Sequence, residues 1–142
     1  MAFYDSSISV FQVTDTGAVL RDISAYITQI GGVPGVRELT DVTSLVDTGK
    51  KWNPSIEDVT ITLELLWSED ASVGPDTVLG PLRTDTTARA WDYGPEGKVT
   101  GDIKYSGTCF VRSYEVVSRV GSHVVARAEL KVNGVVTRGT YA

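Results

Sequence analysis

Cysteine and histidine are nearly absent from this 142-residue sequence, which contains one of each, Cys109 and His123. A single cysteine forms no internal disulfide and fits a chain that folds in a reducing compartment. His123 follows a Gly-Ser turn and Cys109 lies within a strand pattern, which favours a surface histidine and a small buried hydrophobe over catalytic groups. With no zinc-binding set and no glycine-rich phosphate loop, we expect a protein without enzymatic activity, metal or cofactor.

Long apolar runs and an excess of basic residues are also missing. No stretch approaches the roughly 18 apolar residues that a transmembrane helix needs, and the first residues lack the pattern of a signal peptide. Asp and Glu number 18 against 13 Lys and Arg, which gives a net charge of −5. Proteins that read duplex DNA usually have a basic surface. We therefore expect neither membrane insertion nor specific DNA binding.

The residues that are plentiful favour β structure. Val, Ile, Thr and Tyr are common, and 14 glycines supply turns. We expect one domain over residues 1–142, mainly β, built as an antiparallel β-sandwich or partly closed barrel. One short flanking α-helix is expected near residues 75–85, where Pro75 suits a first turn. Strands are expected at residues 8–13, 18–30, 57–67, 86–93, 98–120, 124–132 and 135–141.

Two short segments predict hairpin turns. In Asp15-Thr16-Gly17 the Asp side chain can bond the following backbone, and Gly tolerates positive φ. Asn133-Gly134 is the dipeptide most typical of a two-residue β-hairpin turn. We therefore expect residues 124–132 and 135–141 to pair with each other across it.

Residues 31–55 form a long inter-strand loop in this interpretation. They contain several glycines and prolines and show no clear helix or strand period. The segment is too apolar for a permanently solvated linker, so we interpret it as an arm that packs against another molecule. The alternative is a loop folded over its own core. The candidate contact residues are Val36, Arg37, Leu39, Val42, Leu45, Val46, Lys50, Lys51 and Trp52.

The segment at residues 41–63, DVTSLVDTGKKWNPSIEDVTITL, resembles the major tail tube proteins of long-tailed, non-contractile bacteriophages. In that family a similar segment joins a long loop to the central strand. Residues 22–27 (DISAYI), 88–97 (ARAWDYGPEG) and 130–139 (LKVNGVVTRG) resemble further family motifs in the same order. Pro54-Ser55-Ile56 departs from the Pro-Gly-Leu of many relatives.

The resemblance implies a structural virion protein. Six subunits would form a ring, stacked rings would form a tube, and DNA would pass through it during ejection. The tail tip, tail terminator and tape measure proteins would be partners, and assembly would occur in the host cytoplasm. The arm would reach an adjacent subunit or ring, and we expect the arm and the termini to become ordered on assembly. Acidic walls would let DNA slide; the candidate lumen-facing acids are Asp58, Glu64, Glu115 and Glu129.

Two alternatives stay open at the level of sequence. One is the tube or ring protein of a contractile tail or of a type VI secretion system, which shares the class of fold. The other is a monomeric β-sandwich binding module, for example for carbohydrate, which would need a solvent-facing aromatic platform. Trp52, Trp67 and Trp91 are the only tryptophans. Trp67 lies on the apolar face of an alternating strand, so we expect it to pack in the core.

Overall fold

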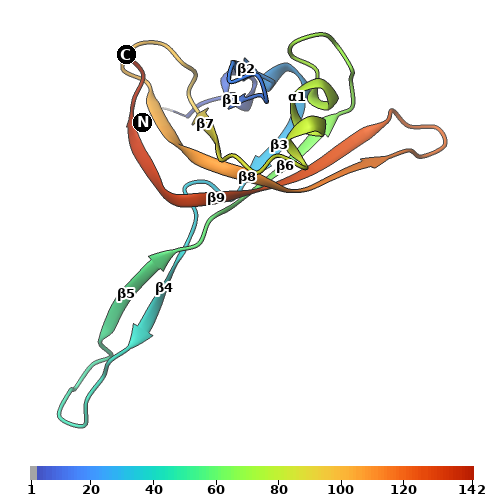
Figure 1. The fold of residues 1–142 in the computed structure, drawn as a ribbon. Helices are drawn as coiled ribbons and strands as arrows, with labels where there is room; N and C mark the ends of the chain where they lie inside the picture. The colour runs from blue at the N-terminus through green and yellow to red at the C-terminus, as the bar shows by residue number, and fades with distance from the viewer. Residues whose placement is uncertain (1–2) are drawn as a thin grey trace.

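The computed structural model describes residues 3–142; residues 1 and 2 of the expected domain lie outside the described part. The chain forms β-strands, two short 3₁₀ turns and one α-helix, in the order drawn in Figure 1. The elements are η1 (Ser6–Ile8), β1 (Val10–Thr14), β2 (Leu20–Asp22), η2 (Ser24–Tyr26), β3 (Ile27–Gly31), β4 (Arg37–Asp41), β5 (Trp52–Glu57), β6 (Thr60–Leu66), α1 (Pro75–Leu82), β7 (Arg89–Gly94), β8 (Ile103–Val117) and β9 (Val125–Thr140).

Seven of the strands form one antiparallel sheet in the order β2-β1-β7-β8-β9-β6-β3. The sheet curves strongly, and α1 lies inside the curve (Figure 1). The 15-residue β8 and the 16-residue β9 form its central hairpin. The other two strands, β4 and β5, pair only with each other. The expected mainly β, antiparallel class with one short helix is confirmed, and the sheet stays open rather than closing into a barrel.

The core lies between the concave face of the sheet and α1. In β6 the buried residues Ile61, Leu63 and Leu65 alternate with Thr60, Thr62 and Glu64, as the sequence pattern predicted. The helix contributes Val78, Leu79 and Leu82 from one face. The buried apolar set is Phe11, Val13, Ile23, Val59, Ile61, Leu63, Leu65, Val78, Leu79, Leu82, Trp91, Cys109, Val111, Ala126, Ala128, Leu130 and Val132.

The helix occupies the first part of the expected range. Pro75 stands in its first turn, where the missing N–H costs nothing, and Pro81 lies in its last turn. Gly74 precedes the helix at a crowded point, because a Cβ there would lie 2.5 Å from the Asp70 amide nitrogen. No helix among residues 3–142 has the length and apolar character required to cross a membrane.

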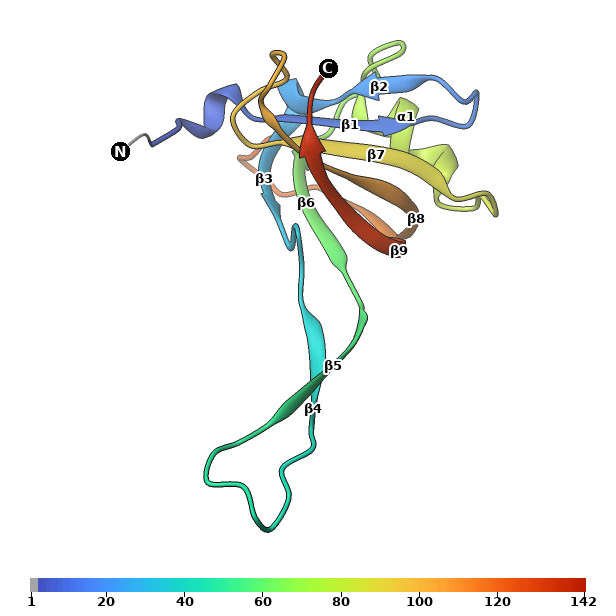
Figure 2. The same ribbon diagram turned by 90° about the vertical axis from the view of Figure 1, so that its left-hand side faces the viewer.

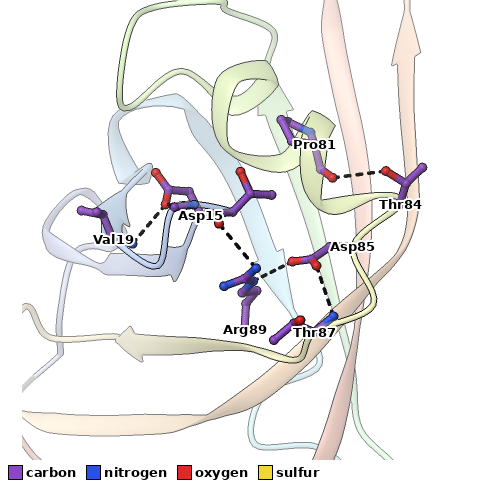
Figure 3. Close-up of polar contacts among 9 residues, drawn as sticks. Asp15, Val19, Pro81, Thr84, Asp85, Thr87 and Arg89 are labelled. Atoms are coloured by element: carbon purple, nitrogen blue, oxygen red, sulfur yellow. Dashed lines mark hydrogen bonds and ion pairs between the residues drawn. The ribbon is translucent and has the colours of Figure 1, made fainter.

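A polar brace holds the exit of the helix against the first hairpin (Figure 3). Arg89 donates from Nε to the Asp85 carboxylate at 2.6 Å and from Nη2 to the Thr16 carbonyl at 3.5 Å. This hydrogen bond from Arg89 lowers the pKa of Asp85. Asp15 accepts the backbone N–H of Val19 at 3.0 Å, so the turn predicted at residues 15–17 is confirmed.

Residues 18–30 do not form the single strand that the sequence suggested. The strand stops at Asp22, whose carboxylate accepts both the N–H and the hydroxyl of Ser24. This side-chain turn competes with strand pairing and starts η2. The chain then crosses to the opposite edge of the sheet as β3.

The prediction of a hairpin turn at Asn133-Gly134 is wrong. Strand β9 runs through these residues and pairs with β8 on both sides of them, with a register shift opposite residues 106–108. Gly134 has φ +92°, so the dipeptide supplies a positive-φ residue to a bulge instead of a turn. The turn of this hairpin lies between β8 and β9, where Gly121 has φ +80°.

The expectation that residues 31–55 lack structure of their own is also wrong. Strand β4 lies within this range and β5 begins in it at Trp52; the two pair as a hairpin that projects far from the sheet (Figure 2). The irregular spacing of apolar residues concealed them, since neither face of this hairpin is buried by the rest of the chain.

Candidate functional site

The first candidate site is the projecting hairpin; the arm expected at residues 31–55 is from here on taken as this hairpin, residues 37–57. It leaves the sheet between β3 and β6 and points away from the core (Figures 1 and 2). Every residue of β4 and β5 is exposed. The alternative of a loop folded over its own core is therefore wrong.

One face of the arm is largely apolar. The register pairs Leu39 with Pro54 and Asp41 with Trp52, which puts these four side chains on one face. Leu39 is 50% exposed and Trp52 is 53% exposed. Thr40 and Asn53 pair on the opposite, polar face. A two-stranded hairpin of this kind is rarely stable alone in water, so its apolar face suits a partner.

The tip of the arm displays its most exposed apolar residues, Leu45 and Val46. Their exposures are 107% and 89%. Lys50 pairs with Asp41 at 3.1 Å and Lys51 pairs with Asp47 at 2.8 Å. These two lysines, expected to contact a neighbour, thus make ion pairs within the tip.

The tip is also held by hydrogen bonds. Val42 donates its N–H to the Lys51 carbonyl at 3.0 Å, and Thr43 accepts the Lys51 N–H at 2.9 Å. The hydrogen bond from Lys51 lowers the pKa of Asp47, and the hydrogen bond from Thr43 lowers that of Asp41. The other two candidate contact residues, Val36 and Arg37, lie at the base of the arm and are exposed.

Two glycines fix the base of the arm. Gly32 and Gly35 have φ values of +91° and +101°. A Cβ at Gly32 would lie 2.1 Å from the Thr60 carbonyl oxygen, and one at Gly35 would lie 2.5 Å from the Val59 side chain. Only glycine fits either place without a shift of its neighbours, so the direction in which the arm leaves the body depends on them.

The second candidate site is the convex face of the sheet, opposite the core. Strand register places Glu64, Arg127 and Glu115 in one row across β6, β9 and β8. Glu129 lies in the next row, and Asp58 comes just before β6. The structure therefore brings all four predicted acids together on one surface.

Basic residues on this surface offset the acids. Asp58 pairs with Lys131 at 2.5 Å, Glu64 with Arg127 at 3.8 Å, and Glu129 with Arg112 at 3.7 Å. Within the part of the chain that the structure describes, Glu115 has no basic nitrogen within 4.0 Å. These four acids and their three basic partners sum to −1, so this cluster on the convex face is mixed in sign rather than strongly acidic.

Two free strand edges are a third feature, and sequence reasoning did not locate them. Strand β7 pairs with β8 only from Tyr105 to Cys109, which leaves residues 113–117 of β8 without a neighbour on that side. Strand β6 pairs with β9 only from Val125 to Lys131, which leaves residues 133–140 open on the opposite side. These statements concern pairing within residues 3–142. Open edges of this kind are templates for another strand.

Sequence reasoning also missed Ile56 and Glu57 at the base of the arm. Ile56 is 84% exposed, and the alternation of Trp52, Pro54 and Ile56 could have indicated it. Glu57 accepts the N–H of Val136 at 3.4 Å. This contact joins positions 79 residues apart and left no local signal in the sequence.

Comparison with solved structures identifies the fold. A chain from the tail of an empty GTA particle, refined with C6 symmetry, matches with a TM-score of 0.74 and 13% identity, over 98% of this chain and 100% of that chain. A chain of the SPP1 tail tube matches with a TM-score of 0.71 and 9% identity, over 97% of this chain and 80% of that chain. This chain has the tail tube fold.

A chain from the anti-feeding prophage baseplate is more distant, with a TM-score of 0.65 and 12% identity over 99% of this chain and 97% of that chain. No protein-family model and no curated protein sequence matches. The fold implied by the sequence resemblance is thus confirmed by geometry at identities where residue patterns alone are faint.

The tryptophans do not form the platform that a carbohydrate-binding module would need. Trp91 is 1% exposed in the core, stacked on Phe11 at a centroid distance of 6.2 Å. Trp67 packs against the core, as predicted. Trp52 is exposed on the arm, away from both. The binding-module alternative therefore has no support from the arrangement of aromatic residues.

Proposed function

We propose that this chain is the repeating subunit of a phage tail tube. Six copies form a ring, rings stack into a tube, and double-stranded DNA passes through it during ejection. The observation that carries this proposal is the combination of the tail tube fold with two complementary free edges on the β8–β9 hairpin.

The edges support a head-to-tail contact. The free edge of β8 lies near the turn of the hairpin, and the free edge of β9 lies at its other end and on its other side. A strand that joins β8 antiparallel runs in the direction of β9, so β9 of a second copy fits beside β8 of the first. A contact that uses two different surfaces closes into a ring by rotation. The C6 symmetry of the GTA tail supports six copies.

The arm supplies the second contact. Its exposed apolar face and tip suit burial against the body of a copy in the adjacent ring. Contacts of this kind repeat along the tube axis without closing, which extends the assembly as a filament. Tail tip and tail terminator proteins would then complete its two ends, and a tape measure protein would occupy it during assembly in the host cytoplasm.

The convex sheet face would line the lumen, with Asp58, Glu64, Glu115 and Glu129 toward the DNA. Strand pairing between copies would make this face continuous around the ring. A wall with mixed charges and a small negative excess has few free cations to hold phosphates. It would let DNA slide rather than bind it, which suits a conduit in the virion tail.

The tube of a contractile tail is the second candidate, because the anti-feeding prophage baseplate chain shares the fold. Electron microscopy of whole particles separates the two, since a contractile tail carries a sheath around its tube.

Negative-stain microscopy of the purified protein, with its mass in solution, tests the proposal. Fresh and concentrated samples should show rings or hollow tubes with sixfold views. Samples that stay monomeric at every concentration, and also after addition of a purified tail-tip complex as a seed, would contradict it.

A further inference from the structure

The bulge in β9 turns one backbone amide toward the free edge of that strand. A Cβ on Gly107 of β8 would lie 3.2 Å from the Val135 carbonyl oxygen, so this carbonyl faces β8. In a planar trans peptide the next N–H points the opposite way. The N–H of Val136 therefore faces the open side of β9, where it donates to the Glu57 carboxylate.

Glu57 is the last residue of the arm and belongs to a different part of the sheet. It lies opposite Arg37 in the register of β4 and β5, yet within residues 3–142 its carboxylate makes no ion pair with Arg37 within 4.0 Å. Its side chain instead reaches β9 and accepts the Val136 N–H at 3.4 Å. The Glu57 carboxylate is thus hydrogen-bonded to a backbone N–H on the edge of β9, which would otherwise be free for another strand.

The neighbouring acid holds the arm in a separate way. Asp58 pairs with Lys131 at 2.5 Å, and Lys131 also donates to the Thr60 hydroxyl at 3.2 Å. These contacts involve side chains on the sheet face and leave the backbone edge untouched. The base of the arm is therefore fastened to β9 by two side-chain contacts and by one backbone bond, from the Val132 N–H to the Val59 carbonyl at 3.0 Å. Of these three contacts, only that of Glu57 lies on the part of the edge that β6 leaves open.

We propose that Glu57 is a removable cap on the β9 edge, which couples ring closure to the movement of the arm. In the free subunit the carboxylate occupies the Val136 N–H. In the ring, a backbone carbonyl from β8 of the neighbouring copy takes this N–H and displaces Glu57. This inference rests on the proposed function, because it assumes that the β9 edge pairs with a second copy.

The geometry suits a contact that exchanges. The Glu57–Val136 distance of 3.4 Å is longer than the usual range of about 2.7–3.2 Å for an N–H···O bond, and the bond is exposed to solvent. Release of Glu57 leaves the base of the arm held by the Asp58–Lys131 pair and by the Val132–Val59 backbone bond, so the arm can pivot at this point. Charged side chains on an edge strand restrain premature strand pairing. Here the charged residue also belongs to the arm, so its displacement by an incoming strand changes how the arm is held.

The test compares Glu57→Ala with Glu38→Ala, which removes another exposed acid, from β4 of the same arm. Light scattering measures the lag and the minimum protein concentration for assembly of the full chain. Without the cap, Glu57→Ala should assemble at a concentration lower by about two- to fivefold, the lower half of the range that one hydrogen bond is worth, because this bond is long. Glu57→Gln, which keeps an acceptor oxygen, should lie between it and the wild type, and Glu38→Ala should match the wild type.

Amide exchange in the monomer gives a second measurement that does not depend on assembly. The Val136 amide should exchange faster in Glu57→Ala than in the wild type, with core amides unchanged. Slower assembly of Glu57→Ala, or assembly equal to that of Glu38→Ala, overturns the cap while tubes still form. If the wild type itself forms no rings or tubes, the proposed function fails instead.

Discussion

Substitutions at the tip of the arm should change assembly of the tube without changing folding of the subunit. Leu45 and Val46 are almost fully exposed in the subunit, so changing both to Ser should leave the unfolding temperature unchanged. Burial of a Leu or Val side chain is worth about 1.5–3 kcal/mol. If the adjacent ring covers both, the pair contributes about 3–6 kcal/mol per subunit to stacking before the cost of association.

That energy is large on the scale of assembly, because about 1.4 kcal/mol changes an equilibrium tenfold. The Leu45→Ser, Val46→Ser variant should therefore form rings but few or short tubes, as judged by tube length in electron micrographs and by sedimentation. Val99→Ser is the matched control, since Val99 is 72% exposed on the body, in the β7–β8 loop. It should give tubes of wild-type length.

Either of two results would refute this reasoning. Wild-type tube lengths in the double variant would mean that the tip is not buried on stacking. A clear fall in the unfolding temperature of the monomer would mean that the tip packs on its own body, contrary to the exposure seen here.

Three other changes test different parts of the molecule. Gly35→Ala should lower the free energy of unfolding by about 1–3 kcal/mol, because of its φ of +101°; Gly49→Ala, with open space around its Cα, should not, and chemical denaturation measures both. Burial raises the pKa of Asp92, which accepts the Tyr141 hydroxyl at 2.7 Å. Its contribution to stability is full below pH 3.8 and is lost as the pH rises through the raised pKa; Asp92→Asn should flatten this loss in unfolding temperatures across that pH range, and an unchanged slope would contradict it. Glu115→Lys adds an unpaired cation to the convex face, so tubes of this variant should retain added duplex DNA at low salt in co-sedimentation, whereas wild-type tubes should not; equal retention would place this face outside the lumen.

The ordering of the arm on assembly stays a prediction. In the subunit the tip already has its own hydrogen bonds and ion pairs, so the change on assembly should be protection of exposed amides rather than formation of the hairpin. Hydrogen exchange of monomer and tube should show added protection over residues 42–51. Equal exchange in both states would exclude a contact at the tip.

Local chemistry determined the features that depend on near neighbours. The alternation in β6 predicted its buried face, because successive side chains of a strand point to opposite sides. Asp15 predicted the first turn, because its carboxylate bonds amides within four residues. Pro75 and Pro81 predicted a short helix, since proline restricts where a helix begins and ends.

Tertiary structure decided the features in which one short pattern fits two structures. Asn133-Gly134 supplies positive φ to a hairpin turn or to a bulge, and pairing with β8 along the whole of β9 selected the bulge. The arm has no buried face in its own subunit, so its sequence shows no alternation of apolar and polar residues that would predict its strands.

The proposed assembly surfaces were also decided by tertiary structure. The four acids share one face because register aligns residues far apart in the chain, and the bases beside them arrive in the same way. The free edges exist because β6 and β7 end before the strands they pair with. The sequence by itself determined which side chains alternate and where the chain turns; the three-dimensional pairing of distant strands decided which backbone groups stay open to a second copy, because hydrogen bonds of a sheet form between segments that no local pattern connects.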